Sequence, residues 1–282
     1  MKQSKAGRTL GCFALCAALL LAALRVLILK TAFDETGLLP QGSPALPITV
    51  LACALCFAGL ALLSLRLNRL PGGEYCFTGR PLWLFWKLTG GILLFFGALL
   101  TLLDGRTAPD LAQRLSAWGG MLAGLLLVVI ALLPKRGAGC FWLRFLAALY
   151  TGAALVIRFR VWSHDPMVIH ILPTLLAWTC CMVEMMLLSG FSLNAGHRRS
   201  AVLFGLAAGS FTCMTAPDYL LGLRTELPEL LTLLGLALCG VTAACELLRN
   251  RVQSETADKG GETTDDPQQT TENERQTAEQ TE

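Results

Sequence analysis

Hydrophobic residues gather along the chain in long blocks that short polar stretches separate. The eight blocks cover residues 9–29, 47–67, 82–103, 113–133, 141–159, 167–188, 200–221 and 228–248. At about 1.5 Å per residue, a helix of this length crosses a hydrocarbon core of about 30 Å. Because a backbone in lipid must satisfy its own hydrogen bonds, each block is predicted to be a membrane-spanning helix.

The connections between the blocks predict how the helices are ordered. Each odd-numbered span is expected to cross the membrane in one direction, and the following span returns after a short turn. The fold class predicted is therefore all-α: a polytopic transmembrane helix bundle of about eight spans, arranged as four helical hairpins. The first block lacks a clear small-x-small cleavage site, so we expect an uncleaved span rather than a signal peptide.

Composition agrees with this prediction and excludes several protein classes. Hydrophobic residues make up 54% of the 282 residues and charged residues only 15%, whereas soluble domains carry about 25% charge. A soluble enzyme, a secreted disulfide scaffold and a coiled coil are excluded. The basic residues lie in short loops between apolar blocks, so the expected partner is the lipid bilayer and no nucleic acid is expected.

The last 31 residues differ from the rest of the chain. Residues 252–282 hold nine acidic and two basic residues, a net charge of −7, whereas residues 1–251 carry +10. This segment has too few apolar residues to offset the entropy lost on folding. We therefore predict two regions, a transmembrane domain at 1–251 and a disordered acidic cytoplasmic tail at 252–282. The tail could be a solvated end or a docking segment for a cytoplasmic partner.

Basic residues outside the spans predict the orientation. With a cytoplasmic N-terminus, the inner segments hold twelve Lys and Arg residues and the outer loops hold six. Positive charge accumulates on the cytoplasmic side of membrane proteins. We therefore predict a multi-pass protein of the cell membrane with both termini in the cytoplasm.

Motifs for catalysis and cofactor binding are scarce. Cys53 and Cys56 have CxxC spacing but lie in an apolar block, where cysteine acts as a small hydrophobic residue. The three histidines are dispersed, so we expect no metal site and no cofactor. The chain lacks GxxxxGK[ST], HExxH and GxSxG patterns. Without these motifs an enzymatic activity is uncertain, and a non-enzymatic protein is favoured.

Small residues recur at a spacing of four in three blocks. The residues are Gly120 and Gly124; Ala201, Gly205 and Gly209; and Gly240 and Ala244. This spacing lets membrane helices approach closely. Packing within the chain is favoured over an oligomer interface, because eight spans must pack on one another in any case.

Ionisable residues near the outer ends of the spans are the candidate binding residues. Charged side chains in a membrane are costly, so each is a functional hypothesis. We expect a set of six to line an outer vestibule for a small charged solute or a lipid headgroup: Arg25, Asp104, Arg158, Asp165, His170 and Asp218. The alternative is that these residues cap helices and face water, with Arg25 extending to the interface.

A second hypothesis concerns the fifth and sixth spans. Arg144 and Glu184 are each twenty residues from position 164, the centre of the turn between these spans. In an antiparallel hairpin the two residues lie at one depth, so we predict a partly buried ion pair. The alternative is that the helices are rotated so that the two side chains face apart.

Three functions are compatible with these features. In the favoured one, the protein binds or transports a small solute or is the membrane subunit of a complex. A membrane enzyme could instead act on a lipid-linked or envelope substrate at the outer face, with Asp104, His164, Asp165 or His170 as acid or base. The third is a sensor or scaffold that signals through the acidic tail.

The predicted topology can be tested with reporter fusions. Fusions after Arg69, Lys135 and Arg199 should report a cytoplasmic location, because the basic residues concentrate in these loops. A fusion within residues 104–110 should report an external location. An external signal after Lys135 would contradict the eight-span arrangement.

Overall fold

The computed structural model describes most of the helical region. It covers residues 2–32, 43–67, 71–72, 77, 81–103, 111–133, 138–162, 168–221 and 227–249. Residues Met1–Arg249 form one compact unit. The acidic tail predicted for 252–282 lies outside the described residues.

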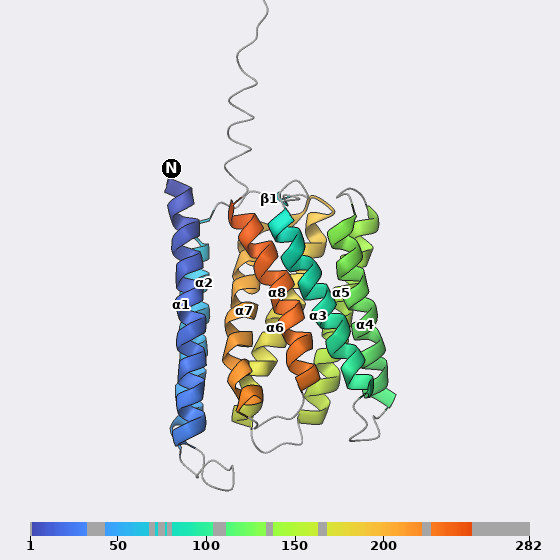
Figure 1. Cartoon of the computed structure of the whole chain (residues 1–282). Helices are drawn as coiled ribbons and strands as arrows, with labels where there is room; N and C mark the ends of the chain where they lie inside the picture. Colours follow the sequence, from blue (N-terminus) through green and yellow to red (C-terminus); the bar gives the residue numbers. More distant parts are fainter. Residues whose placement is uncertain are drawn as a thin grey trace, which may run out of the picture. The chain divides into compact units, whose positions relative to one another are not determined.

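Eight helices long and apolar enough to cross a membrane occur within these ranges (Figure 1). Their bounds are α1 Lys2–Thr31, α2 Ala45–Ser64, α3 Pro81–Leu103, α4 Leu111–Leu132, α5 Ala138–Trp162, α6 Val168–Phe191, α7 Arg198–Leu220 and α8 Leu227–Arg249. The predicted all-α transmembrane bundle is confirmed. Most helix ends fall within a few residues of the apolar blocks, because the length of apolar sequence sets the length of a span.

Successive helices run in opposite directions (Figure 1). We call the end where α1, α3, α5 and α7 begin the proximal end, and the end where the other four begin the distal end. Gly7 in α1 lies against Leu248 near the end of α8, 3.7 Å from an ideal Gly7 Cβ to Leu248 Cδ2. The first and last helices are therefore adjacent at the proximal end.

Helices α6, α7 and α8 form the centre of the bundle. In α7 and α8, 67% and 72% of the span residues are buried, whereas only 22–28% are buried in α1 to α5. The outer helices expose large apolar side chains such as Leu55, Phe85 and Leu122. Such a surface is favourable against lipid, which is therefore the expected surrounding of α1 to α5.

The four hairpins are present, but they are not the most extensive contacts. Helix α3 packs most closely on α8, and α1 packs more on α7 than on its hairpin partner α2. Glycines explain the first contact. A Cβ on Gly235 of α8 would lie 2.6 Å from the Gly90 carbonyl oxygen of α3, and a Cβ on Gly97 would lie 2.7 Å from the Thr232 nitrogen. The two backbones touch because no side chain separates them.

Small residues at a spacing of four lie at contacts between helices of the same chain, as the sequence predicts. A Cβ on Gly124 of α4 would lie 2.8 Å from the Gly91 carbonyl oxygen of α3. A Cβ on Gly205 of α7 would lie 2.9 Å from the Gly240 carbonyl oxygen of α8. These glycines therefore serve intramolecular contacts between α3, α4, α7 and α8.

A short backbone pairing joins two loops at the proximal end. Strand β1 (Pro71–Gly72) pairs antiparallel with β2 (Gly196–His197). In the same region, the Arg199 side chain donates to the carbonyl oxygens of Leu65 and Leu67. Leu65, Leu67 and Pro71–Gly72 of the α2–α3 connection thus contact the start of α7 and the strand before it, which the hydrophobic pattern did not predict.

The glycine contact between α3 and α8 can be tested by its effect on the free energy of unfolding. Gly235→Ala should destabilise the bundle by about 1–3 kcal/mol, because the new methyl group would overlap the α3 backbone. Gly11→Ala is the matched control, since an added Cβ there meets nothing within 4 Å. Free energies of unfolding measured in detergent should separate the two variants. Equal stability would contradict the close contact between α3 and α8.

Candidate functional site

Two charge clusters lie near the distal end, and the first joins α1 to α7. Arg25 Nε donates to Asp218 Oδ1 at 2.7 Å, and Nη2 donates to Oδ2 at 3.1 Å. Both residues are 0% exposed. This two-point geometry is the strongest form of an arginine–carboxylate pair, and it compensates for burying both charges.

The second distal cluster joins four helices. Arg158 of α5 donates to Glu229 Oε1 of α8 at 2.9 Å, and the Tyr219 hydroxyl of α7 donates to Oε2 at 3.0 Å. The Arg158 guanidinium carbon also lies 4.0 Å from the centre of the Trp178 ring of α6. An arginine stacked on tryptophan is a favourable contact, worth up to about 2 kcal/mol when desolvated. The cluster therefore holds α5, α6, α7 and α8 together.

These clusters differ from the predicted outer vestibule. Arg25 and Asp218 were expected to line this vestibule, with capping of helices and exposure to water as the alternative; in the structure both are buried and bound to each other. Helix α1 extends beyond Arg25 to Thr31, so this guanidinium lies inside the bundle, where pairing is the favourable solution. Arg158 is also paired and 18% exposed. Asp104, His164 and Asp165 lie outside the described residues, as does the side chain of His170 in α6.

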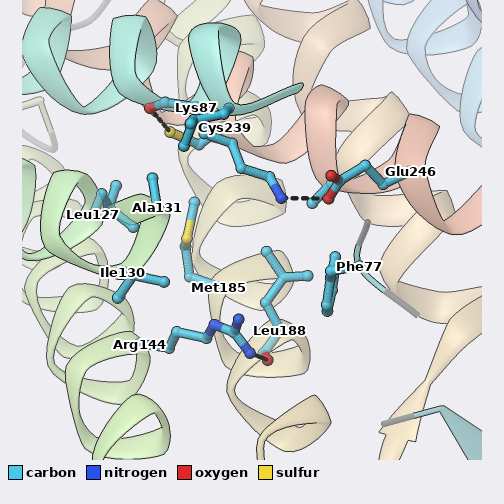
Figure 2. A pocket seen from close by; sticks show the side chains of 12 residues that line it. Phe77, Lys87, Leu127, Ile130, Ala131, Arg144, Met185, Leu188, Cys239 and Glu246 are labelled. Carbon is cyan, nitrogen blue, oxygen red and sulfur yellow. Dashed lines mark hydrogen bonds and ion pairs between the residues drawn. The ribbon is translucent and has the colours of Figure 1, made fainter. Parts of the chain in front are cut away.

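A pocket lies instead at the proximal end (Figure 2). Its cavity volume is about 80 Å³, which exceeds the roughly 10–15 Å³ that one water requires. The walls come from α3, α4, α5, α6 and α8, together with Phe77 from the α2–α3 connection. The lining residues are Phe77, Leu84, Lys87, Leu127, Ile130, Ala131, Arg144, Met185, Leu188, Cys239, Ala243 and Glu246.

Phe77 is placed between the two cations of the pocket. Its ring centre lies 5.1 Å from Lys87 Nζ and 5.3 Å from the guanidinium carbon of Arg144. The ring itself packs edge-on against Phe191 at 5.3 Å. Because cations are attracted to an aromatic face, Phe77 draws both charged groups to the same side of the cavity.

Lys87 and Glu246 form an ion pair across α3 and α8 (Figure 2). Lys87 is partly exposed, whereas the Glu246 side chain is 1% exposed. Only one carboxylate oxygen of Glu246 binds Lys87. The other, Oε1, is buried without a hydrogen-bond partner among the described residues. The pocket thus combines two cations, one carboxylate and otherwise mainly apolar walls.

The predicted pair between Arg144 and Glu184 is not formed. Arg144 Nη1 donates to Ser192 Oγ at 2.9 Å and to the Leu188 carbonyl oxygen at 3.3 Å. Neither carboxylate oxygen of Glu184 has a hydrogen-bond partner among the described residues. Two residues at equal distance from a turn lie at the same depth in the membrane. Their side chains can nevertheless point in different directions around the two helices. Glu184 lies against α7 and α8, whereas Arg144 reaches α6 from α5.

The sequence analysis missed Glu229 and Glu246. Both lie inside the last apolar block, within a few residues of its ends. Acidic side chains in a membrane span require partners. Glu229 has no Lys or Arg within four residues along the chain, and Glu246 has Arg249 three residues later. That signal was present in the sequence. The identity of the partners, Arg158 and Lys87, depends on how α8 packs against α5 and α3.

The Arg25–Asp218 pair can be tested with a double-mutant cycle. Arg25→Met or Asp218→Asn alone should destabilise the protein by about 3–5 kcal/mol, because each leaves an uncompensated buried group. The double variant should recover much of that loss. Free energies of unfolding in detergent give the coupling. Arg114→Met, at an exposed position in α4, is the control, and additive losses would show that the two charges are not coupled.

No protein-family model, no curated protein and no solved structure matches the chain. Groups of three or more His, Cys, Asp or Glu residues that could hold a metal ion are also not found in the described ranges. The function must therefore be inferred from the charged pocket and the helices around it.

Proposed function

We propose that the protein binds a small organic anion with an apolar body in the proximal pocket. It would act as a carrier for this solute or as the binding subunit of a larger membrane complex. The observation that carries the proposal is the Arg144 guanidinium in the wall of a largely apolar cavity, beside Lys87. Ligand sites commonly pair apolar walls with a few placed polar groups.

The charge of the pocket favours an anion. Lys87 and Arg144 contribute two positive charges, and Glu246 contributes one negative charge. The net positive charge borders a mainly apolar cavity, and electrostatic attraction beside such walls is stronger than in bulk solvent. An anionic group near Arg144 would be stabilised, and a cation would be repelled.

The lining also suggests the shape of the ligand. Leucines, isoleucine, alanines and Met185 line most of the cavity, so an apolar body would be buried favourably. The unpartnered Oε1 of Glu246 could accept a hydrogen bond from a hydroxyl or ammonium group beside the anion. A short-chain organic acid fits this description better than an inorganic ion.

The proposed orientation places this pocket on the cytoplasmic side of the cell membrane. The basis is the excess of Lys and Arg in the segments that connect the helices at the proximal end. The distal end is joined by the Arg25–Asp218 and Arg158–Glu229 pairs. A carrier in this arrangement would be accessible from the cytoplasm and closed on the other side.

Three ligands of equal chain length can test the proposal. Hexanoate, hexanol and hexylammonium differ mainly in the charge of the head group. With the full-length protein in nanodiscs, hexanoate should raise the melting temperature most and hexylammonium least. At a ligand concentration of tenfold Kd, the expected stabilisation is about 1.4 kcal/mol. Stabilisation by hexylammonium equal to that by hexanoate would contradict an anion site.

The substitution Arg144→Gln tests whether Arg144 binds the anionic group. Loss of a charge-assisted interaction of about 1.5–3 kcal/mol should weaken hexanoate binding about tenfold to a hundredfold. Hexanol binding should persist, which would show that the cavity itself is intact. Arg114→Gln, on an exposed part of α4, removes the same charge elsewhere and should leave both ligands unaffected. Equal effects of the two substitutions would contradict the site.

A further inference from the structure

Glu184 occupies a space that two glycines leave open at the meeting of α6, α7 and α8. A Cβ on Gly205 of α7 would lie 2.5 Å from Glu184 Oε1, and a Cβ on Gly240 of α8 would overlap the carboxyl group. The residue is 0% exposed. An acidic side chain is thus accommodated where the two neighbouring helices lack side chains of their own.

The carboxyl group has no compensating charge nearby. Neither oxygen has a hydrogen-bond partner among the described residues. The ionisable groups that interact with it electrostatically are thiols, Cys180 and Cys181 on α6 and Cys239 on α8.

The neighbouring helices hold their other ionisable groups in separate contacts. On α5, Arg144 binds Leu188 and Ser192, and on α8, Glu246 binds Lys87. Cys56 of α2 interacts electrostatically with Cys180. Helix α7 presents Gly205 among buried apolar residues such as Val202 and Leu206. No cation in the described part of the bundle is placed to balance a negative charge on Glu184.

An ionised carboxylate in this position would be very costly. A buried charge without a partner costs several kcal/mol or more, and such a group takes up a proton instead. The neutral acid costs only about 1–3 kcal/mol for its unmade hydrogen bonds. In the packed arrangement the group is therefore a carboxylic acid. An acid kept at this cost in a membrane span is by default a functional group.

Residues that adjoin Glu184 and Gly240 in the chain line the proximal pocket. Glu184 precedes Met185, and Gly240 follows Cys239, while Met185 and Cys239 both line the proximal pocket. A small shift of α6 against α8 would bring the carboxyl group to the pocket. There it could release its proton, because a hydrated carboxylate is stable.

We propose that Glu184 is a proton-binding site that controls how α6 packs against α7 and α8. Protonated, neutral Glu184 allows the three helices to pack together. When the helices part, the O–H bond of the acid breaks heterolytically and the proton passes to a water molecule in the pocket. The carboxylate left behind is then hydrated. This inference requires only a proton as ligand, so it does not depend on the organic anion proposed above.

Infrared spectroscopy of the full-length protein in nanodiscs tests the protonation state. At neutral pH the wild type should show a carboxylic acid C=O band that shifts in D₂O, and Glu184→Gln should lose it. Glu229→Gln is the matched control, because Glu229 is nearly as buried but binds Arg158 and Tyr219. That variant should keep the band. Absence of the band from the wild type, or its persistence in Glu184→Gln, overturns the proposal.

Hydrogen–deuterium exchange tests the link to packing. Relative to Glu184→Gln at the same pH, the wild type should exchange faster in peptides containing Gly205 and Gly240 as the pH rises. The excess should grow by up to about tenfold per pH unit, because one proton is released on opening. An identical pH dependence in the two proteins overturns the proposal.

A second variant tests the proposal if Glu184→Gln does not fold. Glu184→Asp retains an acid but draws it back from the space beside Gly240. The infrared band should persist at a changed frequency. An unchanged band would assign it to another group and overturn the proposal.

Discussion

A charged side chain inside a membrane bundle needs a partner, and this requirement determines how the helices of this protein are joined. The three ion pairs within the described ranges link α1 to α7, α3 to α8 and α5 to α8. Each therefore connects two different hairpins. Apolar packing distinguishes poorly between neighbours in lipid, because lipid tails are as apolar as leucine. The buried pairs add the specificity that apolar contacts lack.

Helix α8 is where these contacts converge. Its first turn contributes Glu229, its last turn contributes Glu246, and Gly235 and Gly240 between them allow α3 and α7 to approach. The charged groups fix its two ends, and the glycines allow close contact along its length. This arrangement explains why 72% of its span residues are buried, although its mean hydropathy lies within the range of the outer helices α1 to α5.

The two ends of the bundle differ in how their charges are used. At the distal end Arg25 pairs with Asp218 and Arg158 pairs with Glu229, and each pair connects two helices. At the proximal end Lys87, Arg144 and Glu246 border a cavity, and Phe77 closes one side of it (Figure 2). Glu184 precedes Met185, which lines the same cavity. Among the described residues, the ionisable groups that line a cavity lie at the proximal end, which the positions of the charges along the sequence do not reveal.

Hydrophobic length alone determined the eight spans, their order and their approximate ends, because a helix in lipid must be about as long as the bilayer is thick. The spacing of Gly120 and Gly124, and of Gly205 and Gly209, also predicted close packing within the chain. Only the tertiary structure decided which charges meet. The distance of a residue from a turn fixes its depth, and depth correctly placed Arg144 and Glu184 near the same end. The rotation of each helix and the identity of its neighbours depend on how all eight helices pack together, so Glu184 lies between two glycines while Glu246 binds Lys87.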